Sequence, residues 1–425
     1  MKFTKELYVT PEVLKENKFF KSFINEPLLS KDVAFSGAMK LPRHRWFYYK
    51  PGFSPKLIDY FLDKYTLPAK TLVDPFCGVG TSVIASAINH GFVSHGFDIS
   101  PLAIEISKAK ITNPSSEKIF NAINRINYSK KYKDGIDEYY LKKSFDDVIL
   151  RQLFSIKNEI EHIFEKNSDE ERFLSLCLTS IFHEFAHAKR DGGFLRFEKK
   201  ETIPNVEKRF KEVVTDFIND VVKENNTLFS NSKDQFENIK FEIGDAREIN
   251  MKSNSTGIVL TSPPYLNRYD YTRIYALEMA LIGLSDKDVK AIRKNTLKSH
   301  VEAKHKIFPK LQSPLLDELM DKINTSTLTN QSIPEMILGY FHDIAWSISE
   351  SKRILKKNGI AAFVVGNCRF SGHHVEVDSI IAEIGSNIGL NLENIFVAKA
   401  RGSSVQQVHK YGEIPLRESI VVLKK

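Results

Sequence analysis

Cysteine is scarce in this chain, and long apolar runs are missing. The 425 residues contain three cysteines, Cys77, Cys177 and Cys368, spaced too widely for a disulfide framework or a C-x-x-C metal site. This usage indicates an intracellular, reducing compartment. No stretch reaches the roughly 18 consecutive apolar residues that a membrane span requires, and the N-terminus lacks the apolar core of a signal peptide. We therefore expect a cytoplasmic protein.

Internal repeats and low-complexity linkers are missing as well, which argues against a repeat array. The composition that remains, 42% hydrophobic and 27% charged, is that of a globular protein with one large or two ordinary domains. The net charge is +8 and the pI is near 9.0. A basic surplus of this size is compatible with a polyanionic partner such as nucleic acid.

Strand and helix patterns alternate in two separate parts of the chain. Residues 71–92 are typical of a strand, a Gly-rich turn and a helix, and residues 93–111 of a second strand and helix. The pattern is helical over about 112–237 and again, with many basic residues, over about 267–355. Further strands are expected at 241–249, 257–265, 359–367, 393–400 and 418–425. This order predicts one α/β sheet, parallel in its first part, with two helical insertions.

The turn DPFCGVGTS (74–82) lies between a predicted strand and a predicted helix. Its two glycines permit close backbone approach, and the sharp turn leaves free N–H groups at the helix start. The turn departs from the dinucleotide fingerprint G-x-G-x-x-G, because Val83 replaces the third glycine and Asp74 would repel a pyrophosphate. An aspartate here can hold an ammonium group instead. S-adenosylmethionine, which carries an ammonium and a sulfonium but no phosphate, therefore suits the turn better than NAD.

Two further acids follow predicted strands. Asp98, in GFDIS, lies about 20 positions beyond the turn, where an acidic residue can hydrogen-bond both hydroxyls of a ribose. Asp245, in IGDAR, is placed to accept from an adenine amino group, although such a position is also compatible with an ordinary surface aspartate.

The segment TSPPY (261–265) directly follows a buried-looking strand. Pro263 and Pro264 have no N–H donor, so the strand has to stop in a rigid turn. This turn presents the Ser262 hydroxyl, the Pro263 carbonyl and the Tyr265 ring together.

The segments DPFCGVGT, FDIS, GDAR, TSPPY and GIAAFVVGN, in this order, resemble the motifs of the DNA amino-methyltransferases. That family uses S-adenosylmethionine to methylate N4 of cytosine or N6 of adenine. The resemblance runs from residue 44 to 425 and implies a class I, Rossmann-like methyltransferase sheet with large helical insertions. The implied domains are a catalytic α/β domain (44–112, 238–266 and 356–425), a helical insertion (113–237), a basic helical insertion that is a candidate for DNA recognition (267–355) and an N-terminal extension (1–43).

The resemblance also implies two sets of site residues, and no metal. The cofactor-binding set, for S-adenosylmethionine, is Asp74, Pro75, Phe76, Cys77, Gly78, Gly80, Thr81, Asp98, Ile99, Asp245 and Ala246. The catalytic set is Ser262, Pro263, Pro264 and Tyr265. An exocyclic amine is a poor nucleophile because its lone pair is conjugated into the base. If the Ser262 hydroxyl and the Pro263 carbonyl accept its two N–H bonds, the lone pair is freed. Tyr265 would stack on a base flipped out of the duplex.

The serine of this tetrapeptide resembles the cytosine-N4 branch. We therefore expect a site-specific, base-flipping enzyme that forms N4-methylcytosine in double-stranded DNA. The resemblance implies a restriction-modification system with a cognate endonuclease, in a prokaryotic cytoplasm at the nucleoid. Adenine N6 is the alternative target, and an RNA amino group a further one. Cytosine C5 is not favoured, because Cys77 and Cys368 do not follow a proline as the nucleophile of that reaction does.

Three other segments have more than one interpretation. HRWFYYKPGF (44–53) resembles the family motif that closes over the methionine end of the cofactor, but it also fits a hydrophobic staple before a helix with Ser54 as N-cap and Pro55 at its first position. HEFAH (183–187) matches the helical H-E-x-x-H signature of zinc peptidases, with Glu184 as base. However, Arg190 stands where the extended signature has glycine, and the favoured interpretation is that His183 and His187 pack or contact a phosphate. The third segment, RYDYTRIY (268–275), has aromatics and arginines that can fill the gap left by a flipped base.

DNA contacts are expected in the insertions. The basic residues of 285–310 are either a phosphate-tracking surface or a solvated helix face. They are Lys287, Lys290, Arg293, Lys294, Lys298, Lys304, Lys306 and Lys310. The segment RGSSVQQVHKYGE (401–413) is expected to be a loop near the target strand. A DNA-binding module without catalysis is a third class of function, but it would have no need of acceptors aimed at an amine.

Overall fold

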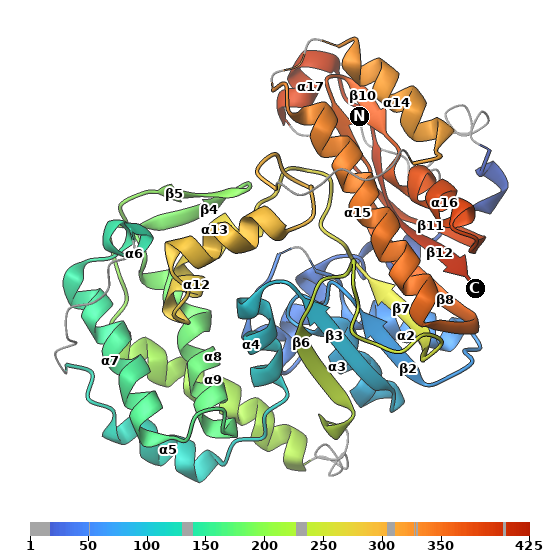
Figure 1. Cartoon of the computed structure of the whole chain (residues 1–425). Coiled ribbons are helices and arrows are strands. Elements are labelled where there is room, and N and C mark those ends of the chain that lie inside the picture. Colours follow the sequence, from blue (N-terminus) through green and yellow to red (C-terminus); the bar gives the residue numbers. More distant parts are fainter. Residues whose placement is uncertain are drawn as a thin grey trace.

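The fold is built on one eight-stranded sheet, with strand order β1-β11-β12-β8-β7-β2-β3-β6 (Figure 1). In the computed structural model of the chain, residues 18–50, 52–129, 139–226, 236–303, 311–326, 328, 330–402 and 405–425 are described. The strands of the sheet are β1 (Phe23–Asn25), β2 (Thr71–Asp74), β3 (Val93–Asp98), β6 (Ile239–Ile243), β7 (Thr256–Thr261), β8 (Leu355–Gly366), β11 (Asn391–Arg401) and β12 (Leu416–Lys424).

The strands β6, β3, β2, β7 and β8 are parallel, whereas β12 runs antiparallel to both of its neighbours, β8 and β11. The predicted α/β class is therefore confirmed.

Two predicted strands are shorter than expected. β6 ends at Ile243, before the sequence GDAR, and β7 ends at Thr261 because the two prolines that follow cannot extend the ladder. Within the predicted N-terminal extension, β1 adds a parallel edge strand to β11.

Helices cover both faces of the sheet, and the residues of β8 alternate between them. Ala362 and Val364 pack in the core formed with α2 (Pro55–Lys64) and α3 (Thr81–His90). Phe363 and Val365 pack in the core formed with the helices of the other face. Those helices are α14 (Pro314–Asn324), α15 (Ile333–Ile354) and α16 (Val377–Asn387). α15 lies in the segment expected to be a basic insertion, yet much of it is a cover for the sheet.

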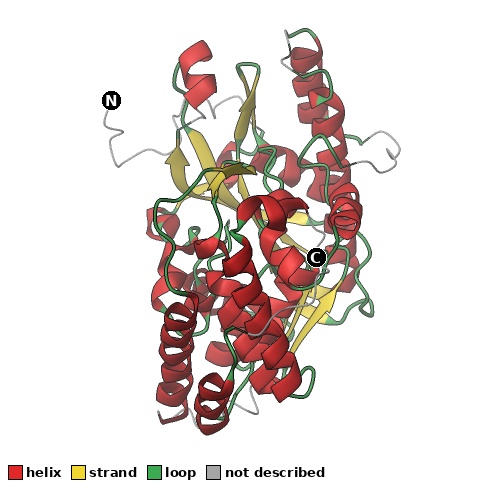
Figure 2. Ribbon diagram, turned by 90° about the vertical axis from the view of Figure 1, so that its left-hand side faces the viewer, coloured by secondary structure: helices red, strands yellow, loops and turns green. Residues whose placement is uncertain are grey.

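A second, largely helical region lies beside β6 and α4 (Pro101–Lys110), at the left of Figure 1. It has its own core, which α4 joins through Leu102 and Ile106. Its helices are α5 (Ser116–Arg125), α6 (Tyr139–Ser144), α7 (Asp147–Ile163), α8 (Asp169–Phe182), α9 (Val206–Asn226), α11 (Tyr271–Ile274), α12 (Ala276–Leu281) and α13 (Asp286–Asn295). In Figure 2, which is turned by 90°, this side of the molecule faces the viewer.

One part of this region departs from the helical pattern expected over about 112–237. The structure has a hairpin there, formed by β4 (Ala188–Asp191) and β5 (Phe194–Phe197). Gly192, with φ of 57°, makes the turn between them, which glycine adopts without the cost of a Cβ atom. The structure also contains a hairpin formed by β9 (Cys368–Phe370) and β10 (His373–Val375), and a short helix, α17 (Val405–Tyr411). Within the described ranges, no helix is long and apolar enough to cross a membrane.

Candidate active site

The Gly-rich turn between β2 and α3 needs both of its glycines. Gly78 and Gly80 have φ of 50° and 82°, in the left-handed region that favours glycine. A Cβ atom on Gly80 would lie 2.7 Å from Cζ of Phe241, so a side chain there would clash. The Gly78 N–H donates to Oδ2 of Asp98 at 2.9 Å, which ties the turn to the end of β3. The turn is thus held against the carboxyl edge of the sheet.

Two carboxylates lie at this edge. Asp74 ends β2 and is buried, and its oxygens accept from the Phe76 N–H (3.0 Å), the Thr261 hydroxyl (2.5 Å) and the Ser82 hydroxyl. Asp98 ends β3 and also accepts from the Ser100 N–H at 2.9 Å. Burial raises the pKa of each aspartate to about 6, although the hydrogen bonds oppose the shift. A cationic ligand would stabilise the ionised forms of both.

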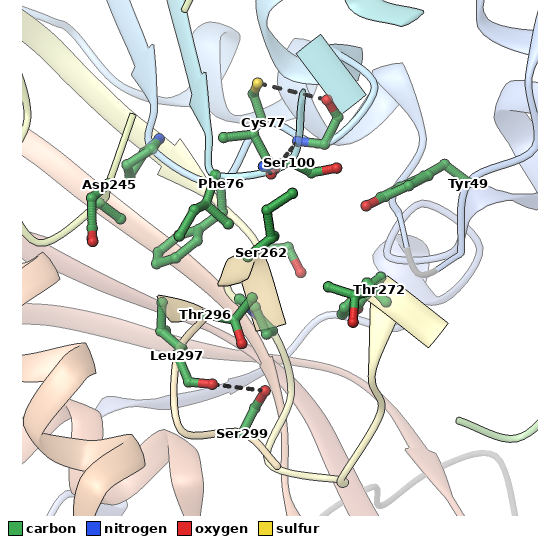
Figure 3. Close-up of a pocket in the computed structure, with 18 of the residues that line it drawn as sticks. Tyr49, Phe76, Cys77, Ser100, Asp245, Ser262, Thr272, Thr296, Leu297 and Ser299 are labelled. Atoms are coloured by element: carbon green, nitrogen blue, oxygen red, sulfur yellow. Dashed lines mark hydrogen bonds between the residues drawn. The ribbon is translucent and has the colours of Figure 1, made fainter. Parts of the chain in front are cut away.

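A cavity opens at the carboxyl ends of β2, β3, β6 and β7, where the order of the parallel strands reverses and ligands usually bind in such sheets (Figure 3). It brings together all of the predicted cofactor-binding residues except Gly80: Asp74, Pro75, Phe76, Cys77, Gly78, Thr81, Asp98, Ile99, Asp245 and Ala246. Of the predicted catalytic residues, Ser262 and Pro264 line this cavity. Ser262 lies near the centre of the view, between Tyr49 and Asp245. The cavity therefore joins the predicted cofactor set to the predicted catalytic turn.

Two further segments line the cavity. Tyr269, Tyr271 and Thr272 belong to the segment 268–275, for which we expected a place beside the flipped base. The residues that sequence reasoning missed come from the end of α13 and the segment after it: Asn295, Thr296, Leu297, Ser299 and His300. Tyr49, from the aromatic segment before α2, stacks on Tyr275 (ring centroids 4.7 Å apart) and on Tyr271 (5.9 Å). Ser54 caps α2 as predicted, accepting from the Lys56 N–H at 3.3 Å. The segment thus both caps a helix and lines the cavity. The residues of 295–300 carry no sequence motif that could have revealed them.

Asp245 is already engaged in an ion pair. Its oxygens accept from Nε (2.9 Å) and Nη2 (2.6 Å) of Arg247, which also pairs with Asp343 at 3.1 Å. The contact to an adenine amino group that we predicted for Asp245 stays a prediction. A ligand there would have to share the carboxylate with Arg247.

Tyr265 is placed differently from the expectation of an open stacking platform. Only 6% of the residue is exposed, and its hydroxyl donates to Oε1 of Glu418 at 2.9 Å. Burial and the Glu418 carboxylate raise the pKa of the Tyr265 hydroxyl well above its ordinary value. The guanidinium of Arg401 lies over the ring, with Cζ 5.5 Å from the centroid. The ring is therefore covered in the free protein.

A second cavity, of about 660 Å³, lies beyond the Ser-Pro-Pro-Tyr turn. It shares Asp270 and His300 with the first cavity. Cationic side chains on its wall are Arg268, Arg273, Arg369, Arg401 and Lys410. The first cavity thus holds the carboxylates of Asp74 and Asp98, whereas cations outnumber acids around the second, where Arg273 pairs with Asp270 and Glu302.

Several of the predicted DNA contacts have other roles. Arg293 is buried and pairs with Asp270 at 2.9 Å, and Lys298 is buried with Nζ 3.4 Å from Glu335. These two were therefore wrongly included in an exposed basic surface. Lys287, Lys290 and Lys294 are exposed, and Lys304, Lys306 and Lys310 lie outside the described residues. The predicted loop 401–413 contains α17.

HEFAH does not form one helix face. α8 ends at Phe182, residues His183–Phe185 form a 3-10 turn, and His187 follows an extended Ala186. Glu184 accepts two hydrogen bonds from Arg209, at 2.7 and 2.8 Å. Within the part of the chain that the structure describes, no group of three or more His, Cys, Asp or Glu side chains is arranged to hold a metal ion. The helical geometry that the zinc-peptidase signature requires is absent at this segment.

A match to a known family identifies the class of protein. Residues 56–333 match the D12 class N6 adenine-specific DNA methyltransferases, and the chain belongs to this family. Family membership implies S-adenosylmethionine as the methyl donor. The expectation of a DNA amino-methyltransferase with a Rossmann-like fold is confirmed. The cytosine-N4 branch is not supported, because the family description names adenine N6.

Individual relatives share most of their length with this chain. The type II methyltransferase M.AvaI of Nostoc sp. is 29% identical over the whole chain and 95% of its own length. The type II methyltransferase M.BsoBI of Geobacillus stearothermophilus is 29% identical over 93% of the chain and 88% of its own length. The type II methyltransferase M.MvaI of Kocuria varians is 24% identical over 80% of each.

Proposed function

We propose that this protein transfers the methyl group of S-adenosylmethionine to an exocyclic amino group of a base in double-stranded DNA, as the methyltransferase of a restriction-modification system. The observation that carries the proposal is the placement of Ser262 in the same cavity as the Gly-rich turn and its two aspartates. The names of the relatives, which are type II methyltransferases, support the restriction-modification role and a cognate endonuclease as partner.

The cavity suits the donor by its charge and shape. S-adenosylmethionine supplies a methyl group on a cationic sulfonium, and it also carries an ammonium. Asp74 and Asp98 would favour both cations, and Asp98 would also accept from ribose hydroxyls. The close turn at Gly78 and Gly80 leaves room for a ligand to approach the backbone. Phe76 and Ile99 add apolar walls.

The tetrapeptide would activate the amine. The Ser262 hydroxyl and the Pro263 carbonyl would accept the two amine N–H bonds, which draws the nitrogen towards sp3 geometry and frees its lone pair for the methyl group. The prolines fix the acceptors before the base arrives, because their φ angles cannot change. Tyr265 would stack on the flipped base. No covalent intermediate with the protein is needed.

Two bases are candidates for the target. Adenine N6 is the first, because the family description names it. Cytosine N4 is the second, because the tetrapeptide begins with Ser262 rather than with Asp or Asn. Both amines present two N–H bonds, so the same acceptors serve either base.

Nucleoside mass spectrometry tests the proposal and separates the two bases. Unmethylated DNA of mixed sequence would be incubated with the protein and S-adenosylmethionine and digested to nucleosides. N6-methyladenine would support the first candidate, and N4-methylcytosine the second. Sequencing of the product would then show the recognition site. Methyl transfer to structured RNA, with none to DNA, would contradict the proposed substrate while leaving the donor site intact.

A further inference from the structure

The Tyr265 ring is the surface on which the proposed function places the target base, yet the free protein covers it. Arg401, the last residue of β11, lies over the ring. The two side chains meet above Gly366. A Cβ atom on this glycine would lie 3.1 Å from Cε2 of Tyr265 and 2.5 Å from Nη2 of Arg401. The missing side chain is thus what lets the guanidinium approach the ring.

Of these two side chains, Tyr265 is the better anchored. Its hydroxyl donates to the Glu418 carboxylate, and Glu418 in turn pairs with Lys399, whose Nζ lies 3.0 Å away. A hydrogen bond to a charged acceptor is stronger than one between neutral groups. The backbone beside the ring is also fixed, because Glu418 of β12 pairs with Gly366 of β8.

Arg401 is held weakly by comparison. Its Nη2 donates to the Asn367 carbonyl at 3.2 Å, and its Nε is buried without a hydrogen-bond partner. An unsatisfied buried donor is costly, so the guanidinium gains hydrogen bonds when it leaves this position. The second cavity lies beside it, and Lys410 and Arg369 line the same wall. A DNA phosphate brought to that wall would attract the departing guanidinium.

We propose that Arg401 is a displaceable cover on the base-stacking surface of Tyr265, which the flipped base replaces while the guanidinium turns into the second cavity towards a backbone phosphate. The inference rests on the proposed function, because it takes Tyr265 as the residue on which the base stacks. A stacked base stabilises contact with an aromatic ring about as much as a cation does, and the departing guanidinium also regains a hydrogen-bond partner for its Nε, so the exchange favours the base. Arg401 is therefore a positioning residue that acts through Tyr265.

If Arg401 is such a cover, its removal should have opposite effects on the binding of a free nucleoside and of duplex DNA. Arg401→Ala removes a competitor from the ring, so free 2′-deoxyadenosine or 2′-deoxycytidine should bind about two- to five-fold more tightly. The same change removes a phosphate contact, so duplex DNA should bind more weakly, and the slope of log K against log salt should become shallower by about 0.9. A residue with a purely structural role, or one that contacts the base directly, would not improve nucleoside binding.

Nucleoside affinity would be measured by saturation-transfer NMR in the presence of S-adenosylhomocysteine, and duplex affinity by titration at several salt concentrations. Lys410→Ala is the matched control, because Lys410 is an exposed cation on the same wall. It should weaken duplex binding without changing nucleoside binding. In a Tyr265→Ala background the gain from Arg401→Ala should disappear. If the alanine change unfolds the protein, Arg401→Gln keeps a donor within reach of Asn367 and should shift both affinities in the same directions.

Unchanged or weaker nucleoside binding in both folded Arg401 variants would overturn the inference. Methyl transfer by the wild-type protein, measured in the same preparations, separates this outcome from failure of the proposed function. If the wild type methylates DNA and the variants gain no nucleoside affinity, only the cover is wrong. If the wild type transfers no methyl group to DNA, the proposed function is wrong and the role of Arg401 falls with it.

Discussion

Two cavities lie near the Ser-Pro-Pro-Tyr turn, and they are built differently. We call the cavity with Asp74 and Asp98 the donor side, and the cavity with Arg268 and Arg401 the base side. On the donor side, the N–H groups of Phe76, Gly78 and Ser100 each have a carboxylate acceptor, and the supporting strands are paired along the sheet. On the base side, Arg401 keeps an unpartnered Nε, and exposed Arg268 has a φ of 66°. A non-glycine residue in that region is strained, and such strain is concentrated at functional sites.

This difference suggests that the donor side is ready to bind before DNA arrives, whereas the base side rearranges with it. Binding of the donor should then depend on few groups and be insensitive to changes in the base pocket. Variants on each side of the turn test this separation.

Ser262→Ala should show most clearly that the base side and the donor side act separately. The variant loses an acceptor for the amine, and turnover on DNA should fall by roughly 10²–10³-fold. Affinity for S-adenosylmethionine, measured by calorimetry, should stay nearly unchanged, because the donor would be held by the turn and by Asp98. Ser299→Ala is the matched control, since Ser299 lines the same cavity but lies outside the tetrapeptide. Equal loss of turnover and donor affinity in Ser262→Ala would show that Ser262 is assigned to the wrong role.

Asp98→Asn should act on the donor side. The change keeps the shape of the side chain and one acceptor, but it removes the charge that faces the donor. Donor binding should weaken by roughly 1–3 kcal/mol through the loss of hydrogen bonds to a charged acceptor. Glu242→Gln, an exposed position on neighbouring β6, is the control and should leave the dissociation constant as it is. An unaltered dissociation constant in Asp98→Asn would rule out its proposed contact with the ribose.

Donor affinity should also depend on pH. The pKa values of Asp74 and Asp98 are raised to about 6, so both carboxyls gain protons as the pH falls through 6. A protonated carboxyl is neutral and attracts a cation less, so donor affinity should be highest above pH 7 and should drop below pH 6 by up to about tenfold per pH unit for each carboxyl. Calorimetric titrations between pH 5 and 8 would check this, and Asp98→Asn should flatten the curve. A flat wild-type profile would argue against the two carboxylates as cation acceptors.

The smallest effect is expected at HEFAH. Glu184→Gln should leave methyl transfer unchanged, and it should lower stability by less than about 1 kcal/mol, because its ion pair with Arg209 is about one-third exposed. Treatment with a chelator should not alter activity either. A loss of methyl transfer on metal removal would contradict a mechanism that uses S-adenosylmethionine without a metal. Zinc bound in proportion to protein would favour the zinc-site interpretation of this segment.

The donor side could be predicted well from the sequence. The order of strand, Gly-rich turn, helix, strand and acid is local, so each step follows from neighbouring residues. That is why ten of the eleven residues of the predicted cofactor set line one cavity, with Gly80 as the exception. The end of β7 could also be predicted from local sequence, because proline has no N–H to donate to a β-ladder.

The base side could not be predicted in the same way. The contact of Arg401 with Tyr265 joins residues 136 positions apart in the numbering, through the pairing of β11, β12 and β8. The basic pattern of 285–310 gave no sign that Arg293 and Lys298 are buried, since their partners Asp270 and Glu335 lie on other segments. The helical pattern around HEFAH did not reveal that tertiary packing ends the helix at Phe182.

The class of protein, the donor turn and the rigid tetrapeptide follow from local sequence, because they depend on glycine, proline and acid placed a few residues apart. The side chains that wall the cavity, the cations buried in ion pairs and the cover of the Tyr265 ring depend on tertiary contacts. Those contacts form between segments far apart in the chain, where pairing of strands and packing of helices, not local conformation, set the distances.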